Sequence, residues 1–144
     1  MEDANYVHNA EFEPKELLVL FNTVGFNRFG EWSLDNVREI FDNTDYYILA
    51  KRRGALIGFV RLLTDWHTRG YISNLCVLPE FHRRGIGKHL MQEILAVCDQ
   101  RQILVVNIFD TTSDPHFYSK FGFVTDTSAV GLLRIRPGAL AAGP

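Results

Sequence analysis

The segment from Val77 to Leu90 holds the residues whose types and spacing best suggest chemistry. It reads as the end of an apolar strand, a short basic loop with Gly85 and Gly87, and the start of an amphipathic helix. A loop that leads into a helix N-terminus presents free backbone N–H groups and the positive end of the helix dipole to one point. This pattern predicts a site for a phosphate or pyrophosphate group.

Two common phosphate-binding motifs do not fit this loop. A P-loop requires Gly-Lys followed by Ser or Thr, but Gly87-Lys88 is followed by His89. A dinucleotide-binding motif requires a third glycine where this chain has Leu90, and no acidic residue follows at the end of the next strand to bind a ribose. We therefore do not predict a nucleoside triphosphatase or a dinucleotide-binding enzyme.

The loop instead resembles the acetyl-CoA motif of the GCN5-related N-acetyltransferase (GNAT) superfamily, Gln/Arg-x-x-Gly-x-Gly/Ala. Here the motif reads His82-Arg83-Arg84-Gly85-Ile86-Gly87, with His82 where the family usually has Gln or Arg. Tyr118 begins a segment, Tyr-Ser-Lys-Phe-Gly-Phe, that is similar to the family's Tyr-x-x-x-Gly-Phe. The resemblance runs from roughly Tyr46 to Phe123.

The resemblance implies an α+β fold with three layers. We expect a mixed, mostly antiparallel, twisted sheet that is flanked by helices and splayed between its fourth and fifth strands. The length of 144 residues and the 47% hydrophobic content suit one compact domain. We expect residues 1–144 to form a single GNAT domain, with residues 136–144 as a loose tail.

The resemblance also implies acetyl-CoA as the co-substrate. The expected pyrophosphate site is the loop formed by His82, Arg83, Arg84, Gly85, Ile86, Gly87 and Lys88. In the family a bulge in the fourth strand turns backbone groups toward the pantetheine arm and the thioester oxygen, and by position these belong to Leu75, Cys76 and Val77.

By the same resemblance, Tyr118 is the general acid that protonates the leaving thiolate, although a core role for this ring is the alternative. Thr111 and Asp114 depart from the Asn and Ala that many relatives carry before this tyrosine. The histone-acetylating branch has a glutamate base where this chain has Tyr71. The sequence leaves the general base open: Asp65, acting through a water, is the nearest carboxylate, and bulk water is the alternative.

Three residues are candidates for the acceptor side: Asp65, Tyr71 and Ser73. Asp65 has an alternative role, because an aspartate in a turn commonly caps its own backbone. The N-terminal region is acidic, with Glu2, Asp3, Glu11, Glu13 and Glu16, and an aromatic mouth could be lined by Phe26, Phe29, Trp32 and Trp66. Together these features suit a cationic or aromatic amine, but a solvated acidic face is the alternative explanation of the acidic residues.

We therefore expect an N-acetyltransferase that moves the acetyl group directly to a primary amine of a small molecule. The alternatives are a catalytically silent acyl-CoA-binding sensor or scaffold, and a peptide or protein N-acetyltransferase. Homodimers are common in the family, so we also consider a homodimer.

Composition narrows the partners and the compartment. The net charge of −2 provides no basic field for nucleic acid. Cys76 and Cys98 lack metal-ligand spacing, so no metal site is predicted and a reducing cytoplasm is the natural compartment. No apolar run is long enough for a membrane span, and Met1-Glu2-Asp3 lacks the basic and apolar stretches of a signal peptide, so we expect neither membrane insertion nor export.

Periodicity predicts the elements that must hold these residues. Pro14 begins a first helix, and Ser33 caps a second that buries Leu34 and Val37. The later elements, in chain order, are strands Tyr46–Lys51, Ala55–Leu63 and Arg69–Val77, a helix over Gly85–Val97, a strand over Ile103–Phe109 buried on both faces, a helix over Pro115–Lys120, and final strands at Phe123–Val124 and Leu132–Ile135.

Overall fold

The computed structural model describes residues 3–109 and 114–139 and divides the chain into two compact units. The first unit covers Met1–Ile108 and the second covers Phe109–Pro144. Each unit is described by itself below. None of the described helices is both long enough and apolar enough to cross a membrane.

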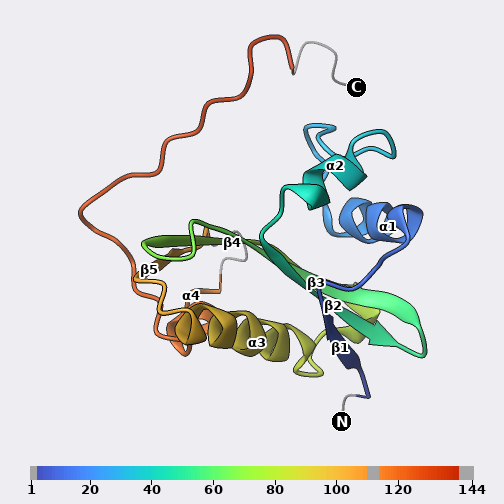
Figure 1. Cartoon of the computed structure of the whole chain (residues 1–144), viewed down its shortest axis with the longest axis horizontal. Coiled ribbons are helices and arrows are strands. Elements are labelled where there is room, and N and C mark those ends of the chain that lie inside the picture. Colours follow the sequence, from blue (N-terminus) through green and yellow to red (C-terminus); the bar gives the residue numbers. More distant parts are fainter. Residues whose placement is uncertain (1–2, 110–113, 140–144) are drawn as a thin grey trace. The chain divides into compact units, whose positions relative to one another are not determined.

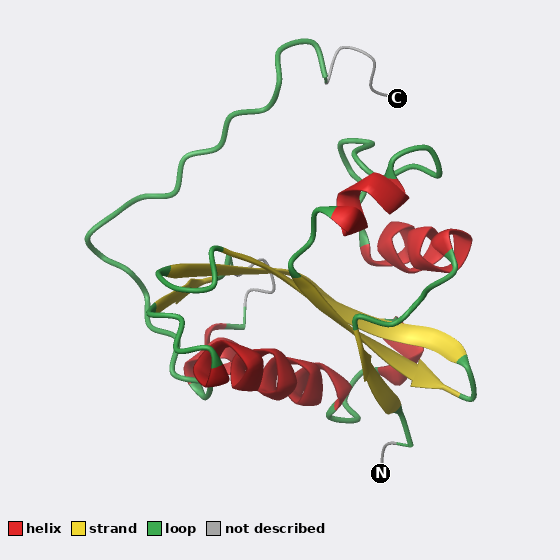
Figure 2. Cartoon of the chain, viewed as in Figure 1, coloured by secondary structure: helices red, strands yellow, loops and turns green. Residues whose placement is uncertain are grey.

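The first unit is built on one five-stranded sheet (Figures 1 and 2). Its strands are β1 (Asn5–His8), β2 (Tyr46–Arg52), β3 (Ala55–Thr64), β4 (Arg69–Val77) and β5 (Val105–Asn107). They lie side by side in chain order. All neighbours are antiparallel except β4 and β5, which are parallel. The expected mixed, mostly antiparallel sheet is therefore confirmed.

Helices cover both faces of this sheet (Figure 1). On one face lie α1 (Pro14–Val24) and α2 (Val37–Asp42), and on the other lies α3 (Ile86–Gln100). A 3-10 helix, η1 (Pro79–Phe81), separates β4 from the loop before α3. Because β4 and β5 are parallel, the chain must cross over between them, and α3 is that crossover. The three-layer architecture thus places the basic loop at the end of β4.

An aromatic cluster fills the core beneath α1 and α2. The ring of Phe59 on β3 lies 5.3 Å from that of Phe21 and 5.5 Å from that of Phe41, measured between centroids. Trp32 packs on Phe21 at 4.7 Å and is itself buried. Trp32 is therefore a core residue rather than part of an exposed aromatic mouth. The cluster holds the first two helices against the face of the sheet that carries Phe59.

Two sequence predictions in the first unit are wrong in detail. The second helix begins at Val37 rather than near Ser33, because the Asn36 side chain accepts a hydrogen bond from the Ser33 N–H and holds a turn there. Leu34 lies on this turn with 54% of its surface exposed. The fifth strand is also shorter than predicted and is not buried on both faces, since Leu104 is 80% exposed.

The second unit contains α4 (Pro115–Ser119), close to the predicted helix. The predicted final strands are wrong: residues 121–139 adopt no strand conformation. Several of their apolar side chains are exposed, namely Val124, Val130, Leu132 and Leu133, and Leu132 is 94% exposed. The apolar pattern of residues 132–135 was correct for a strand, but a strand also needs a neighbour, and none of the described segments pairs with it.

Candidate functional site

The loop between β4 and α3 is tied to the end of the strand by His82. The Nε2 atom of His82 lies 2.7 Å from the carbonyl oxygen of Val77. A carbonyl can only accept, so Nε2 carries the hydrogen of this bond. The side chain of His82 therefore ties the loop to the end of β4.

The backbone of the loop turns its N–H groups outward. Arg83 has φ +63° and Gly85 has φ +81°, with Arg84 at negative φ between them. Alternating conformations of this kind direct successive N–H groups toward one point, as in the nests that bind anions. The first hydrogen bond of α3 runs from the His89 N–H to the Gly85 carbonyl, at 3.0 Å.

The backbone N–H groups from Arg83 to Lys88 accordingly bond to no acceptor among the described residues. The space beside them is open, because a Cβ atom added to Gly85 would meet no atom within 4 Å. This is the arrangement that an anion at a helix N-terminus requires.

Basic side chains surround this point. Arg83, Arg84 and Lys88 are exposed, and the first turn of α3 has no acidic residue. The Cζ atom of Arg84 lies 5.3 Å from the ring centroid of Phe81, a cation–π contact that restrains its guanidinium beside the loop. Ile86 is buried and anchors the start of the helix in the core. The structure thus holds fixed N–H groups and mobile positive charges at one place.

The end of β4 next to this loop has an open edge. Phe59 pairs with Cys76 and Arg61 pairs with Ser73, so Val60 on β3 faces two residues of β4. This is a β-bulge, and Asn74 within it has φ +58°. On the other side, β5 pairs only with Arg69–Tyr71. On the side of β4 that faces β5, residues 72–77 therefore have no described strand as a partner, in agreement with the expected splay between the fourth and fifth strands.

Backbone groups rather than a thiol are available at positions 75–77. The Cys76 side chain belongs to the core cluster and is only 7% exposed. Burial raises the pKa of its thiol far above the ordinary value, so the thiol stays protonated at neutral pH. The Val77 carbonyl already accepts from His82. These facts argue against an acyl-enzyme on Cys76 and leave the edge of β4 to contribute amide groups.

Two of the three acceptor-side candidates lie together. Tyr71 pairs with Leu63, and Ser73 pairs with Arg61. Residues directly opposite in an antiparallel ladder place their side chains on the same face, so these four side chains share one face of the sheet. Arg61 and Leu63 also line a cavity with residues of α2, which identifies this face as the one that α2 covers.

Asp65 has a different role. Its Oδ1 atom accepts from the backbone N–H groups of His67, Thr68 and Arg69, and its Oδ2 atom accepts from the Thr68 hydroxyl. The hydroxyl of Thr68 and these backbone groups hold the pKa of the Asp65 carboxyl well below its usual value. A carboxylate stabilised in this way is a weak general base, and Asp65 caps the turn between β3 and β4.

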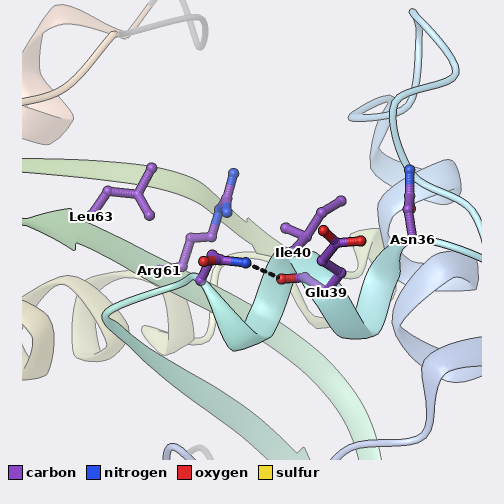
Figure 3. A pocket seen from close by; sticks show the side chains of 6 residues that line it. Asn36, Glu39, Ile40, Arg61 and Leu63 are labelled. Atoms are coloured by element: carbon purple, nitrogen blue, oxygen red, sulfur yellow. Dashed lines mark hydrogen bonds between the residues drawn. The ribbon is translucent and has the colours of Figure 1, made fainter.

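The sequence analysis missed Arg61. Its signal was a charged residue at an inward-facing position of an otherwise apolar strand, where a burial argument would expect Leu or Val. Together with Leu63 it forms one wall of an open cavity of about 390 Å³, and α2 forms the other wall (Figure 3). The cavity is described further below.

Tyr118 lies on α4 in the second unit and is 8% exposed. Its ring contacts those of Phe117 and Phe123, with centroids at 4.9 Å and 6.0 Å. Gly122 has φ +92°, a conformation that favours glycine and explains this position in the Tyr-x-x-x-Gly-Phe segment. Asp114 caps α4 by accepting from the His116 N–H, at 3.1 Å. Thr111 lies outside the described residues.

The geometry of the loop, the bulge and the splayed strands agrees with a comparison of the sequence with known families. The family model of the Acetyltransferase (GNAT) family matches residues 7–123. The chain belongs to this family. Among residues 3–109 and 114–139, no three His, Cys, Asp or Glu side chains gather in a group that would hold a metal ion.

Individual GNAT relatives include two proteins from photosynthetic organisms. The chain is 32% identical over 126 residues to the uncharacterized N-acetyltransferase ycf52 of Gracilaria tenuistipitata var. liui. This match covers 85% of this chain and 68% of that protein. It is 28% identical over 102 residues to the chloroplastic GCN5-related N-acetyltransferase 3 of Arabidopsis thaliana, covering 69% of this chain and 42% of that protein. The chain thus spans less than half of the Arabidopsis relative.

A solved GNAT-type structure shows the same fold. The predicted acetyltransferase of Clostridium acetobutylicum, crystallised with acetyl-CoA, superposes with a TM-score of 0.65 at 17% sequence identity. The match covers 90% of this chain and 96% of that chain. At this identity the comparison concerns the fold.

Proposed function

We propose that this GNAT protein uses acetyl-CoA and transfers the acetyl group directly to a primary amine of a small molecule. The observation that carries the proposal is the run of open backbone N–H groups from Arg83 to Lys88 beside the splayed end of β4. The Clostridium structure, which contains acetyl-CoA in a similar fold, supports the same co-substrate.

The residues of the loop fit a pyrophosphate. Its backbone N–H groups supply fixed donors at a helix N-terminus, and Arg83, Arg84 and Lys88 supply positive charge. When bound, acetyl-CoA supplies an activated thioester. The open edge of β4 at Leu75 and Cys76 then offers an amide N–H to the oxygen on which negative charge develops. Such a donor contributes about 3–4 kcal/mol to a barrier in typical acyl-transfer enzymes.

The proposed general acid is Tyr118, whose Oη would donate a proton to the departing sulfur. A phenol with a pKa of about 10 protonates a thiolate of pKa about 8.5 at a small energetic cost when donor and acceptor are aligned. The amine would lose its proton to water, since Asp65 is occupied as a turn cap. The neutral, buried thiol of Cys76 supports direct transfer without a covalent acyl-enzyme.

The experiment that tests the proposal measures thiol release from acetyl-CoA with a panel of polyamines, arylalkylamines, amino acids, aminoglycosides and basic peptides. We expect release above the hydrolysis background with one small-molecule class. Release with basic peptides alone would replace the small-molecule acceptor by a peptide or protein. Thermal stabilisation by acetyl-CoA without release for any amine would favour an acyl-CoA sensor or scaffold. The absence of both thiol release and thermal stabilisation would refute the proposed cofactor site.

Two matched variants test the general acid. Tyr118→Phe removes one phenol oxygen from α4, and we expect turnover to fall at least tenfold with acetyl-CoA affinity retained. The control Tyr47→Phe removes a phenol oxygen that donates to the Ala10 carbonyl at 2.7 Å in the core. It should lower stability but not turnover per folded molecule. Equal turnover in Tyr118→Phe and wild type would rule out the acid role.

We further propose a homodimer. Within its sheet β5 is an edge strand, and the segment 130–135 exposes Val130, Leu132 and Leu133. Exposed edges and unpaired apolar segments favour pairing between copies. Light scattering at micromolar concentration should give twice the mass of the chain, and a Leu132→Asp variant should give the monomer mass. A wild-type monomer would exclude this proposal.

For the compartment we propose the cytoplasm, because both cysteines are free and buried. The name of the Arabidopsis relative assigns that protein to the chloroplast. Microscopy of the tagged full-length protein in its native cell would decide between the cytoplasm and a plastid.

A further inference from the structure

Arg61 is a charged residue whose hydrogen-bond partners are all neutral. Its Nε atom donates to Asn74 Oδ1 at 2.8 Å, and its Nη1 atom donates to Thr44 Oγ1 at 3.2 Å. Its Cζ atom lies 5.0 Å from the ring centroid of Trp32, which is buried. In the part of the chain that the structure describes, no carboxylate forms an ion pair with this guanidinium.

This arrangement is energetically costly for the free protein. The Arg61 side chain is partly buried, and burial lowers the pKa of its guanidinium, which means that the surroundings disfavour the charge. Arginine nevertheless remains protonated in proteins. A partly buried charge without a counter-charge is destabilising, so an anion that binds there gains a full electrostatic partner.

The guanidinium faces an open cavity of about 390 Å³ between α2 and β3 (Figure 3). The lining residues are Asn36, Glu39, Ile40 and Asn43 from the α2 side, and Arg61 and Leu63 from β3. This volume is within the range of small-molecule sites. The Nη2 group of Arg61 makes no hydrogen bond with any described residue and remains available to a ligand.

The amides in the cavity are already engaged. Asn36 Nδ2 donates to the Glu31 carbonyl at 2.8 Å, and Asn43 Nδ2 donates to the Glu39 carbonyl at 2.9 Å. The side chain of Glu39 is exposed at the rim and makes no ion pair with Arg61. Water screens an exposed carboxylate strongly, so Glu39 does not neutralise Arg61.

The cavity lies next to the place where acyl transfer is proposed. Arg61 pairs directly with Ser73, and Asn74 Oδ1 accepts both from Arg61 Nε and from the Ser73 hydroxyl. Asn74 is the bulge residue with φ +58°, and it precedes the open edge at Leu75. At about 3.3 Å per strand residue, Ser73 and Cys76 are separated by roughly 10 Å or less along β4. The acceptor that we infer would span this distance between the cavity and that edge.

We propose that this cavity binds the acceptor and that Arg61 is the specificity residue, recognising an anionic group on the amine. The expected acceptor is a primary amine that also carries a carboxylate or a phosphate. This inference rests on the proposed function. It adds an anionic group to the cationic or aromatic amine that the sequence suggested, because a ligand in this cavity meets Arg61 rather than the acidic N-terminal surface.

The test compares acceptors that differ only in the anionic group. The pairs are lysine and cadaverine, tyrosine and tyramine, and phosphoethanolamine and ethanolamine, each assayed by thiol release from acetyl-CoA. We expect kcat/KM for the anionic member of one pair to exceed that of its partner at least tenfold. Preference in the first two pairs identifies a carboxylate as the recognised group, and preference in the third identifies a phosphate.

Variants locate this preference. Arg61→Gln removes the charge and keeps a side-chain amide that can donate to Asn74, and it should lower kcat/KM for the anionic acceptor at least tenfold with little change for its neutral counterpart. The control Arg38→Gln removes an exposed arginine of α2 that pairs with Glu11 outside the cavity. It should leave the preference unchanged. Thermal stabilisation by acetyl-CoA must be retained in both variants, which shows that the bulge and the loop are intact.

A binding arm separates this inference from the proposed function. Calorimetry measures the affinity of lysine, tyrosine and phosphoethanolamine, and of their non-anionic partners, for wild type and for Arg61→Gln without any turnover. If no amine is acetylated but an anionic compound binds wild type and not the variant, direct acyl transfer fails and the anion site stands. Any of three results overturns the inference. They are equal use of the two members of every pair, a preference that Arg61→Gln does not change, and the absence of any anion-dependent turnover or binding.

Discussion

Replacing Gly85 with alanine should weaken acetyl-CoA binding at least tenfold, whereas the same change at Gly54 should not. The two glycines form a matched pair. Both have φ +81°, and a Cβ atom at either position would meet nothing within 4 Å of the protein. Gly54 lies in the turn between β2 and β3, and Gly85 lies beside the open N–H groups of the loop.

The magnitudes follow from these positions. An L-residue in the left-handed conformation costs roughly 1–2 kcal/mol, so each variant should lose that much stability. For a chain of this size, Tm should fall by roughly 2–8 °C in both cases. At Gly85 the new methyl group also occupies the space that the pyrophosphate must approach. The loss of one hydrogen bond to a charged group, about 1.5–3 kcal/mol, corresponds to an affinity loss of about 10- to 100-fold.

Calorimetry with acetyl-CoA measures Kd, and a thermal melt without ligand measures the common stability loss. We expect Gly54→Ala to keep the wild-type Kd within about twofold. If Gly85→Ala also binds within twofold of wild type while its Tm falls as in Gly54→Ala, the N-terminus of α3 is not the cofactor site.

Three other changes test the packing and the electrostatics. Glu93 lies between His8 Nε2, at 2.5 Å, and His89; burial raises the pKa of Glu93, but its hydrogen bonds to the two histidines outweigh burial and lower it below the ordinary 4.5. The stability that ionised Glu93 contributes is therefore complete above the unfolded pKa and is lost as pH falls through the folded pKa. Tm should fall more steeply below about pH 4.5 in wild type than in Glu93→Gln. Parallel curves of Tm against pH would contradict this. Phe59→Ala should cost about 3–5 kcal/mol in urea unfolding because the ring is fully buried, and a cost under 1 kcal/mol would mean that the aromatic cluster is not the main core. Cys76→Ala should keep kcat/KM within about threefold because the thiol is neutral; a loss of a hundredfold would point to a nucleophilic thiol.

The elements with strong local signals were predictable. The strand Arg69–Val77 was predicted with the bounds observed for β4, and the helix predicted over Gly85–Val97 is α3, which begins one residue later and ends three residues later. Alternation of apolar residues defines the strand, and apolar residues at helical spacing define the helix. In both cases the pattern spans many residues, so the local preference and the packing agree.

The last strands and the fifth strand were less predictable because pairing partners are distant in sequence. Residues 132–135 have the composition of a strand, but β-structure requires a neighbouring backbone, and their side chains are exposed instead. The run from Ile103 to Phe109 is apolar throughout, yet only Val105–Asn107 meet β4. The hydrophobicity of these residues predicted burial, but it did not identify the strand with which they would pair.

The sequence by itself determined the geometry of the proposed cofactor loop, because its requirements are local. A strand end, basic residues, Gly85 at a positive φ and an amphipathic helix follow one another within 14 residues, from Val77 to Leu90, and they place their N–H groups together whatever the rest of the chain does. The same holds for the turn that Asp65 caps, whose donors are the nearby residues His67, Thr68 and Arg69.

Only the tertiary structure placed together the residues of the proposed acceptor site. The bulge at Asn74 depends on the register between β3 and β4, and the open edge of β4 depends on how soon β5 diverges from it. The role of Arg61 depends on Asn74, 13 positions ahead in the chain, and Thr44, 17 positions behind, because both are hydrogen-bond partners without a negative charge. Such properties arise from contacts between distant segments, so no local pattern of residues records them.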